Sequence, residues 1–162
     1  MYAAQRRWIP ANNRGVRTTL EVMSEFAREP SELVRATALA ILPRNPDLFP
    51  DALRAWLSAH IRQEPDPYNV ELLRTPEFAL SIIGERGAVG GDCDDVATLA
   101  AALALAAGFD ARYIAVAWGT DYSHVYTEVL APGPPPIWYQ MDVHRPPTDG
   151  LPEPTRELVV YP

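Results

Sequence analysis

Cys93 is the only cysteine of the chain, and it lies where the turn Gly90–Gly91 gives way to a helical pattern. The first backbone N–H groups of a helix have no partner within it, and the helix dipole favours negative charge there. Both effects stabilise a thiolate relative to a thiol, so the position favours a nucleophilic cysteine. His124 and Asp142 follow further along the chain. A cysteine, a histidine and an aspartate on separate elements can supply a nucleophile, its base and the residue that orients the base.

Three acids flank the cysteine, at Asp92, Asp94 and Asp95. Acids in a first helical turn usually cap the helix and complement its dipole, which is the structural interpretation of this cluster. Carboxylates so close to a thiol also oppose its ionisation, so a paired imidazolium from His124 would have to outweigh them. A metal site that combines these acids with His124 and Asp142 has no local ligand signature, and we expect neither a metal nor another cofactor.

His144 is a rival for the role of the base, because it shares strand parity with Asp142. It is followed by Arg145-Pro146-Pro147, which predicts an exposed strand end instead. His60 lies on an amphipathic helical segment and is expected at the boundary of the core. Trp56, Trp118 and Trp138 are expected in the core, and Trp138 is also a candidate for the wall of the site.

The composition indicates a single ordered globular domain of 162 residues, with 48% hydrophobic and 22% charged residues. The net charge of −7 and the pI near 4.9 argue against nucleic acid and anionic membranes as partners. A lone cysteine excludes an intramolecular disulfide, and a working thiol requires a reducing compartment, which predicts the cytoplasm. No signal peptide is visible, and no apolar run is long enough to span a bilayer.

The periodicity changes from 3.6 to 2 after the cysteine helix, so we expect an α+β fold in which helices precede an antiparallel sheet. Within one domain we expect an extended arm (1–17), a helical half (18–87), a catalytic core (88–145) and a proline-rich surface tail (146–162). Thr75-Pro76-Glu77 is a helix start signal, and Gly108 is expected to end the cysteine helix. The expected helices cover 18–29, 32–42, 51–62, 76–85 and 93–107, and the expected strands cover 111–118, 122–130 and 137–143. In the second helix the residues expected to face inward are Leu33, Ala36, Ala40 and Ile41.

Strand parity tests whether the histidine and the aspartate can meet. If His124 and Asp142 lie opposite each other on neighbouring antiparallel strands, alternate residues share their face of the sheet. That face would carry His124, Tyr126, Glu128, Trp138, Gln140 and Asp142. A base and its orienting residue require this arrangement.

The segment from Gly90 to Val143 resembles the transglutaminase-like superfamily, whose members have a papain-like core, and it looks most like bacterial and phage-encoded members. The resemblance is carried by a nucleophile motif (91–95, GDCDD), a helix–glycine–Ala-Arg strand (99–113), a histidine motif (124–129, HVYTEV) and a tryptophan-to-aspartate strand (138–142, WYQMD). Tyr126 stands where a tryptophan is common in the family, and Val143 replaces the proline that often follows the aspartate. The helical N-terminal half matches no family pattern.

This resemblance implies cysteine-dependent acyl transfer at a carboxamide or peptide bond of a protein or peptide substrate. Cys93 would form a thioester, His124 would act as the base, and Asp142 would orient it; water or an amine would then accept the acyl group. The N–H of Cys93 is a natural oxyanion donor, and Tyr68 and Asn69 are candidates for a second donor or for substrate binding. The alternative from another class is a catalytically idle domain used in assembly, for example of a phage-like particle; a third is a metal-dependent hydrolase. The sequence leaves the oligomeric state open.

Overall fold

The computed structural model describes residues 6–10, 15–66, 70–145 and 152–162. Its helices are α1 (Gly15–Arg28), α2 (Glu32–Ile41), the short 3-10 helix η1 (Pro46–Leu48), α3 (Phe49–His60), α4 (Pro76–Arg86) and α5 (Cys93–Ala106). Its strands are β1 (Arg6–Pro10), β2 (Ile61–Gln63), β3 (Val70–Arg74), β4 (Val89–Gly91), β5 (Ala111–Ala117), β6 (His124–Ala131), β7 (Ile137–Gln140) and β8 (Arg156–Val160).

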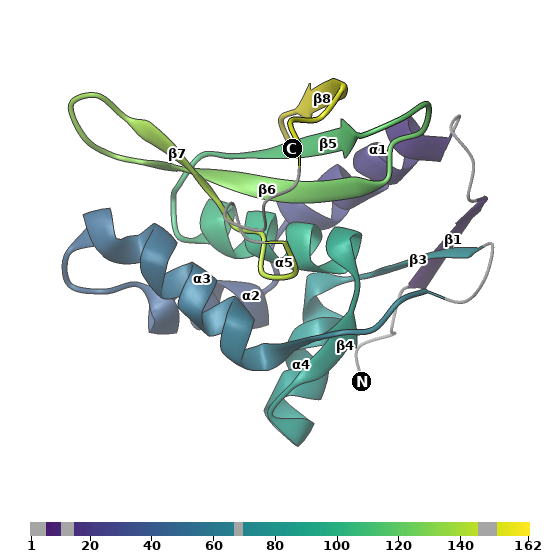
Figure 1. Cartoon of the computed structure of the whole chain (residues 1–162). Helices are drawn as coiled ribbons and strands as arrows, with labels where there is room; N and C mark the ends of the chain where they lie inside the picture. Colours follow the sequence, from purple (N-terminus) through teal and green to yellow (C-terminus); the bar gives the residue numbers. More distant parts are fainter. Residues whose placement is uncertain (1–5, 11–14, 67–69, 146–151) are drawn as a thin grey trace.

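The main sheet is antiparallel, with the strand order β7-β6-β5-β8, and the helices lie against one of its faces (Figure 1). Helix α5 is central to the molecule, because it contacts α1, α2, α3 and α4 as well as strands of the sheet. Two small pairs complete the structure: β1 with β3, antiparallel, and β2 with β4, parallel. The α+β architecture expected from the sequence is confirmed.

Helix α5 is enclosed because its sequence is apolar on every side. All residues from Val96 to Ala104 are buried, and most of them are alanine or leucine. The alanines let neighbouring elements approach the helix closely, and the Thr127 hydroxyl of β6 donates to the Ala97 carbonyl at 2.7 Å. Gly108 follows the helix with a φ of 86°, a left-handed conformation that glycine adopts without a Cβ penalty. The cysteine at the helix start is therefore anchored to the centre of the fold.

Enlarging this helix should destabilise the protein. Ala101 is completely buried, so Ala101→Leu is expected to lower the free energy of unfolding by about 1–3 kcal/mol through overpacking. Urea unfolding followed by circular dichroism measures the change. Ala36→Leu, at an exposed position of α2, is the matched control and should change stability by less than about 0.5 kcal/mol. Equal effects at both positions would contradict the close packing around α5.

The signals at the ends of α4 have the expected roles. The Thr75 hydroxyl accepts from the Phe78 N–H at 3.3 Å, and Gly87 ends the helix with a φ of 80°.

The prediction for α2 is wrong in one respect. Its buried residues are Val34 and Ala38, whereas Ala36 and Ala40 are exposed and Leu33 and Ile41 are half-buried. Apolar residues occur on several sides of α2, which leaves its inward face ambiguous, and the contact with α5 decides it.

The terminal segments need a further correction. The helix expected from residue 18 begins at Gly15, and β1 of the expected arm pairs with β3. The tail is more than a surface segment, because β8 pairs with β5 as an edge strand of the main sheet. Leu158 and Val160 alternate along β8 and pack against the core, which gives this strand its place. No helix in the described parts of the chain combines the length and apolar character needed to cross a membrane.

Candidate functional site

Three elements position the candidate residues. Cys93 is the first residue of α5, and Asp92 before it is the N-cap residue. His124 is the first residue of β6, and Asp142 follows the end of β7 by two residues. Gly91 permits the tight entry into α5, because a Cβ at this position would lie 3.0 Å from the Cβ of Asp95. A larger residue at position 91 would have to displace the side chain of Asp95.

His124 and Asp142 are in direct contact. The imidazole Nε2 is hydrogen-bonded to the carboxylate Oδ2, and both side chains are buried. The other oxygen, Oδ1, accepts from the backbone N–H groups of His144 at 3.0 Å and Arg145 at 2.8 Å. The carboxylate is therefore held at both oxygens. Because Asp142 occupies Nε2, Nδ1 is the ring nitrogen that remains for another partner.

The strand pairing explains how this contact forms. Glu128 lies opposite Gln140 and Leu130 lies opposite Trp138, so even-numbered residues of β6 and β7 share a face. The predicted parity is confirmed. The register differs by two residues, because Gln140 lies opposite Glu128 and not opposite Tyr126, as a direct pairing of His124 with Asp142 would require. Asp142 thus lies beyond the paired part of β7 and reaches His124 from the strand end.

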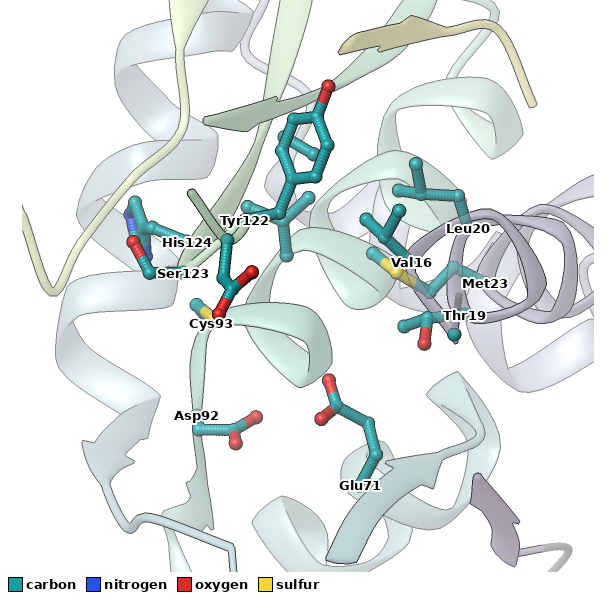
Figure 2. A pocket seen from close by; sticks show the side chains of 14 residues that line it. Val16, Thr19, Leu20, Met23, Glu71, Asp92, Cys93, Tyr122, Ser123 and His124 are labelled. Carbon is teal, nitrogen blue, oxygen red and sulfur yellow. The ribbon is translucent and has the colours of Figure 1, made fainter. Parts of the chain in front are cut away.

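Cys93 and His124 line the same cavity, which has a volume of about 390 Å³ (Figure 2). The backbone N–H of Val125 donates to the Cys93 sulfur, so the sulfur lies at the first residues of β6, beside His124. The remaining lining falls into an acidic group (Glu71, Asp92, Asp121), an apolar group from α1 (Val16, Leu20, Met23) and a set of neighbouring residues (Gly15, Thr19, Ala115, Tyr122, Ser123, Val125).

Several lining residues have no signal in the sequence. Glu71 and the α1 residues are far from Cys93 along the chain, and only the fold brings them to the cavity. Trp138, which was expected as a possible wall, is not part of the described lining. It lies under the Arg112 guanidinium at 4.2 Å and contacts Tyr161, which corrects that expectation. Tyr68 and Asn69 lie outside the described residues.

The thiol of Cys93 is less acidic than its place at a helix start suggests. The side chain keeps some access to the cavity, but protein atoms surround the sulfur closely. Burial raises the pKa of Cys93 to about 12, the Asp92 carboxylate adds to this, and the Val125 N–H opposes it. The opposition of nearby carboxylates that the sequence indicates is therefore joined by desolvation, and both favour the neutral thiol over the thiolate.

Asp95 and Asp94 of the nucleophile motif have different environments and roles. Asp95 accepts from the Arg74 N–H at 2.9 Å and forms an ion pair with the Arg74 guanidinium, so it ties α5 to β3. Burial raises the pKa of Asp95 to about 7, although Arg74 opposes the shift. Asp94 is fully buried, and neither of its carboxylate oxygens has a hydrogen-bond partner among the described residues. Burial, and then the neighbouring Asp92, raises the pKa of Asp94 well above its ordinary value.

Carboxylate oxygens of Asp92, Asp94 and Asp95 lie within 4.8 Å of one another, a spacing that a cation could bridge. However, Asp95 is already paired with Arg74, and the positive end of α5 points at the cluster. Burial and the adjacent Asp92, which raise the pKa of Asp94, instead favour a carboxyl group that keeps its proton. The predicted capping role also needs correction, because the Asp92 side chain makes no cap hydrogen bond.

His144 has a supporting role. Its backbone N–H bonds Asp142, while the Nε2 of its ring has no partner among the described residues. Burial lowers the pKa of His144, although the Asp142 carboxylate opposes this shift. The residue that Asp142 orients is therefore His124. As expected, His60 lies at the edge of the core, where its ring stacks on Trp56.

Comparison with known families agrees with this arrangement. The model of the transglutaminase-like superfamily matches residues 38–143, which adds part of the helical half to the segment recognised from its motifs. Neither the curated proteins nor the solved structures include a significant match. The match spans more than half of the sequence, and it contains the cysteine, the histidine and the aspartate described above. The chain belongs to the transglutaminase-like superfamily.

Proposed function

We propose that the protein is a cysteine-dependent acyltransferase or amide hydrolase that acts on a carboxamide or peptide bond. One observation carries the proposal: Asp142 binds Nε2 of His124, while His124 lines the same cavity as Cys93. This leaves Nδ1 of His124 available to the thiol. No cofactor is needed for the reaction, and the cytoplasm is the proposed location, since the thiol must stay reduced.

The first half of the reaction forms a thioester. Nδ1 of His124 takes the proton of Cys93 as the sulfur attacks the carbonyl carbon. The oxyanion that develops can accept from the N–H of Cys93, which has no acceptor within α5 because it opens the helix. The C–N bond then breaks, and His124 returns the proton to the leaving amine. Asp142 stabilises the imidazolium between these two transfers.

The second half consumes the thioester. A water molecule or an amine gives a proton to His124 and attacks the thioester carbonyl, and the sulfur leaves as the thiol after taking that proton back. Water yields a carboxylic acid, and an amine yields a new amide. A protein or a peptide is the proposed substrate in both cases.

A catalytically idle assembly module is the second candidate. The raised pKa of Cys93 and the carboxylates beside it favour this alternative, because they oppose a reactive thiol. The two candidates share the fold and differ in whether a thioester forms.

Trapping the acyl-enzyme separates them. Incubation with a library of glutamine-containing and lysine-containing peptides, followed by acid quenching, is expected to add an acyl mass to the peptide that contains Cys93. Hydroxylamine should remove this mass. Cys93→Ala should show no adduct, and His124→Ala should show at most a trace while remaining folded by circular dichroism. A wild-type protein that acquires no adduct from any of these peptides would support the idle module.

A further inference from the structure

We propose that the cavity recognises a positively charged, non-reacting group of the substrate, an ammonium or a guanidinium on an aliphatic stem, and holds it between Glu71 and Asp92. The inference rests on the proposed function and names a feature of its substrate. It comes from the charges and the shape of the space beside Cys93.

The polar side of the cavity is acidic. Glu71 comes from β3 and Asp92 from the start of α5, and their side chains extend toward the same space near Cys93 (Figure 2). Asp121 adds a third carboxylate to the lining. Among the described residues that line the cavity, none is an arginine or a lysine. Arg74, which lies on the same strand as Glu71, is already paired with Asp95, and the Arg156 guanidinium lies over the ring of Tyr122.

Among the described residues, no cation neutralises the carboxylates that line the cavity, because neither Glu71 nor Asp92 forms an ion pair. The Oδ1 atom of Asp92 is buried next to the Asp94 carboxyl group, so Asp92 can meet a ligand only through its other oxygen. Negative groups that share a partly enclosed space repel one another, so a cation that enters between them is stabilised by both. An anionic substrate group would be excluded from the same space.

The opposite side of the cavity suits an aliphatic stem. Val16, Leu20 and Met23 of α1 line it, and the total volume of about 390 Å³ falls within the range of small-ligand sites. Lysine, ornithine and arginine side chains combine an apolar stem with a cationic end. An attacking amine must be unprotonated, whereas these carboxylates favour the protonated form. The bound cation therefore belongs to a part of the substrate that does not react.

Such a cation would also assist the chemistry. Asp92 and Glu71 both contribute to the raised pKa of Cys93. A positive charge bound between them offsets this contribution, so the thiol gives its proton to His124 more readily once the right substrate is bound. The resting protein would keep a neutral thiol and the complex would activate it.

The test uses two thiol reagents that differ in charge, the trimethylammonium-ethyl and the sulfonatoethyl methanethiosulfonates. Each forms a mixed disulfide with the Cys93 sulfur and releases methanesulfinate, so no turnover is required. The rate ratio of cationic to anionic reagent, divided by the same ratio for glutathione, is expected to be at least roughly tenfold in the wild type. Glu71→Gln should lower it several-fold, and 1 M NaCl should reduce it as well.

Glu85→Gln is the matched control, because Glu85 is exposed on α4 and loses the same charge far from the described lining of the cavity. A wild-type ratio equal to that of glutathione would overturn the inference, and so would a cavity that admits neither reagent. The peptide library supplies a second test: lysine-containing peptides should acylate Cys93 at least tenfold faster than peptides with norleucine in place of lysine. If the cationic reagent reacts faster but no peptide forms an acyl-enzyme, the proposed function is rejected and the cation site stands. If both peptides acylate Cys93 at the same rate and the reagent ratio equals that of glutathione, only the cation site is rejected.

Discussion

Asp142→Asn is expected to lower kcat by roughly 10³- to 10⁴-fold, the size of loss that follows when a catalytic histidine is held in the wrong tautomer. In the wild type, Oδ1 of Asp142 accepts from the N–H groups of His144 and Arg145. An asparagine must place its carbonyl oxygen there, because its amide nitrogen cannot accept these bonds. The amide nitrogen would then face Nε2 of His124 and donate to it. The ring proton would move to Nδ1, which could no longer take the proton of Cys93.

Two measurements check this prediction. Single-turnover acylation of Cys93 gives the loss in rate, and ¹⁵N NMR of the histidine ring reports which nitrogen carries the proton. Asp110→Asn, at an exposed position outside the site, should leave both unchanged. If Asp142→Asn keeps its rate within tenfold of the wild type, Asp142 does not control the tautomer of His124.

Asp94→Asn is expected to raise the free energy of unfolding at pH 8 by roughly 1–3 kcal/mol, the usual cost of a buried polar group that has no hydrogen-bond partner. The Asp94 carboxyl group is buried beside Asp92 and Asp95, and its pKa is raised. A group whose pKa is raised on folding holds its proton more tightly in the native state. Ionising it at high pH therefore costs stability, whereas an uncharged amide in the same place avoids that cost and can donate to Asp92.

The sign of the pH dependence follows from the same shifts. Asp95, with a pKa of about 7, and Asp66, raised mainly by burial to about 6, ionise at lower pH when unfolded. The wild type should therefore lose stability as the pH rises from about 4 to 8, and Asp94→Asn should lose less. Urea unfolding at pH 5 and at pH 8 measures both curves, with Asp110→Asn as the charge-matched control. A wild type that is more stable at pH 8 than at pH 5 would contradict this account.

Local signals in the sequence predict much of the fold. Thr75, Pro76 and Gly87 define the ends of α4 through a side-chain cap and a left-handed residue, both of which depend on a few neighbouring residues. Strand β8 could not be predicted in the same way. Its short sequence follows several prolines, and its place is determined by the free edge of β5, which belongs to a distant part of the chain.

Some features of the candidate site also follow from local sequence patterns, and others depend on the fold. Strand parity brings His124 and Asp142 to one face, so their contact could be anticipated from alternation alone. The register could not, because it depends on where β7 ends. The ionisation of Cys93 was also beyond the sequence, since desolvation depends on how tightly the fold encloses the sulfur. Glu71 reaches the cavity only because β3 runs past the start of α5.

The enclosure of α5 distinguishes the helix that carries Cys93 from the segments that supply most of the rest of the cavity lining. The amide hydrogens of a helix surrounded on all sides exchange with solvent only when the whole domain opens, so this helix belongs to the slowest-exchanging unit of the protein. The start of α1, β3 and the turn before β6 supply most of the rest of the lining and, unlike the middle of α5, include exposed or half-buried positions. New ligand preferences can therefore arise by changing these segments, while the part of the chain that carries the sulfur stays fixed.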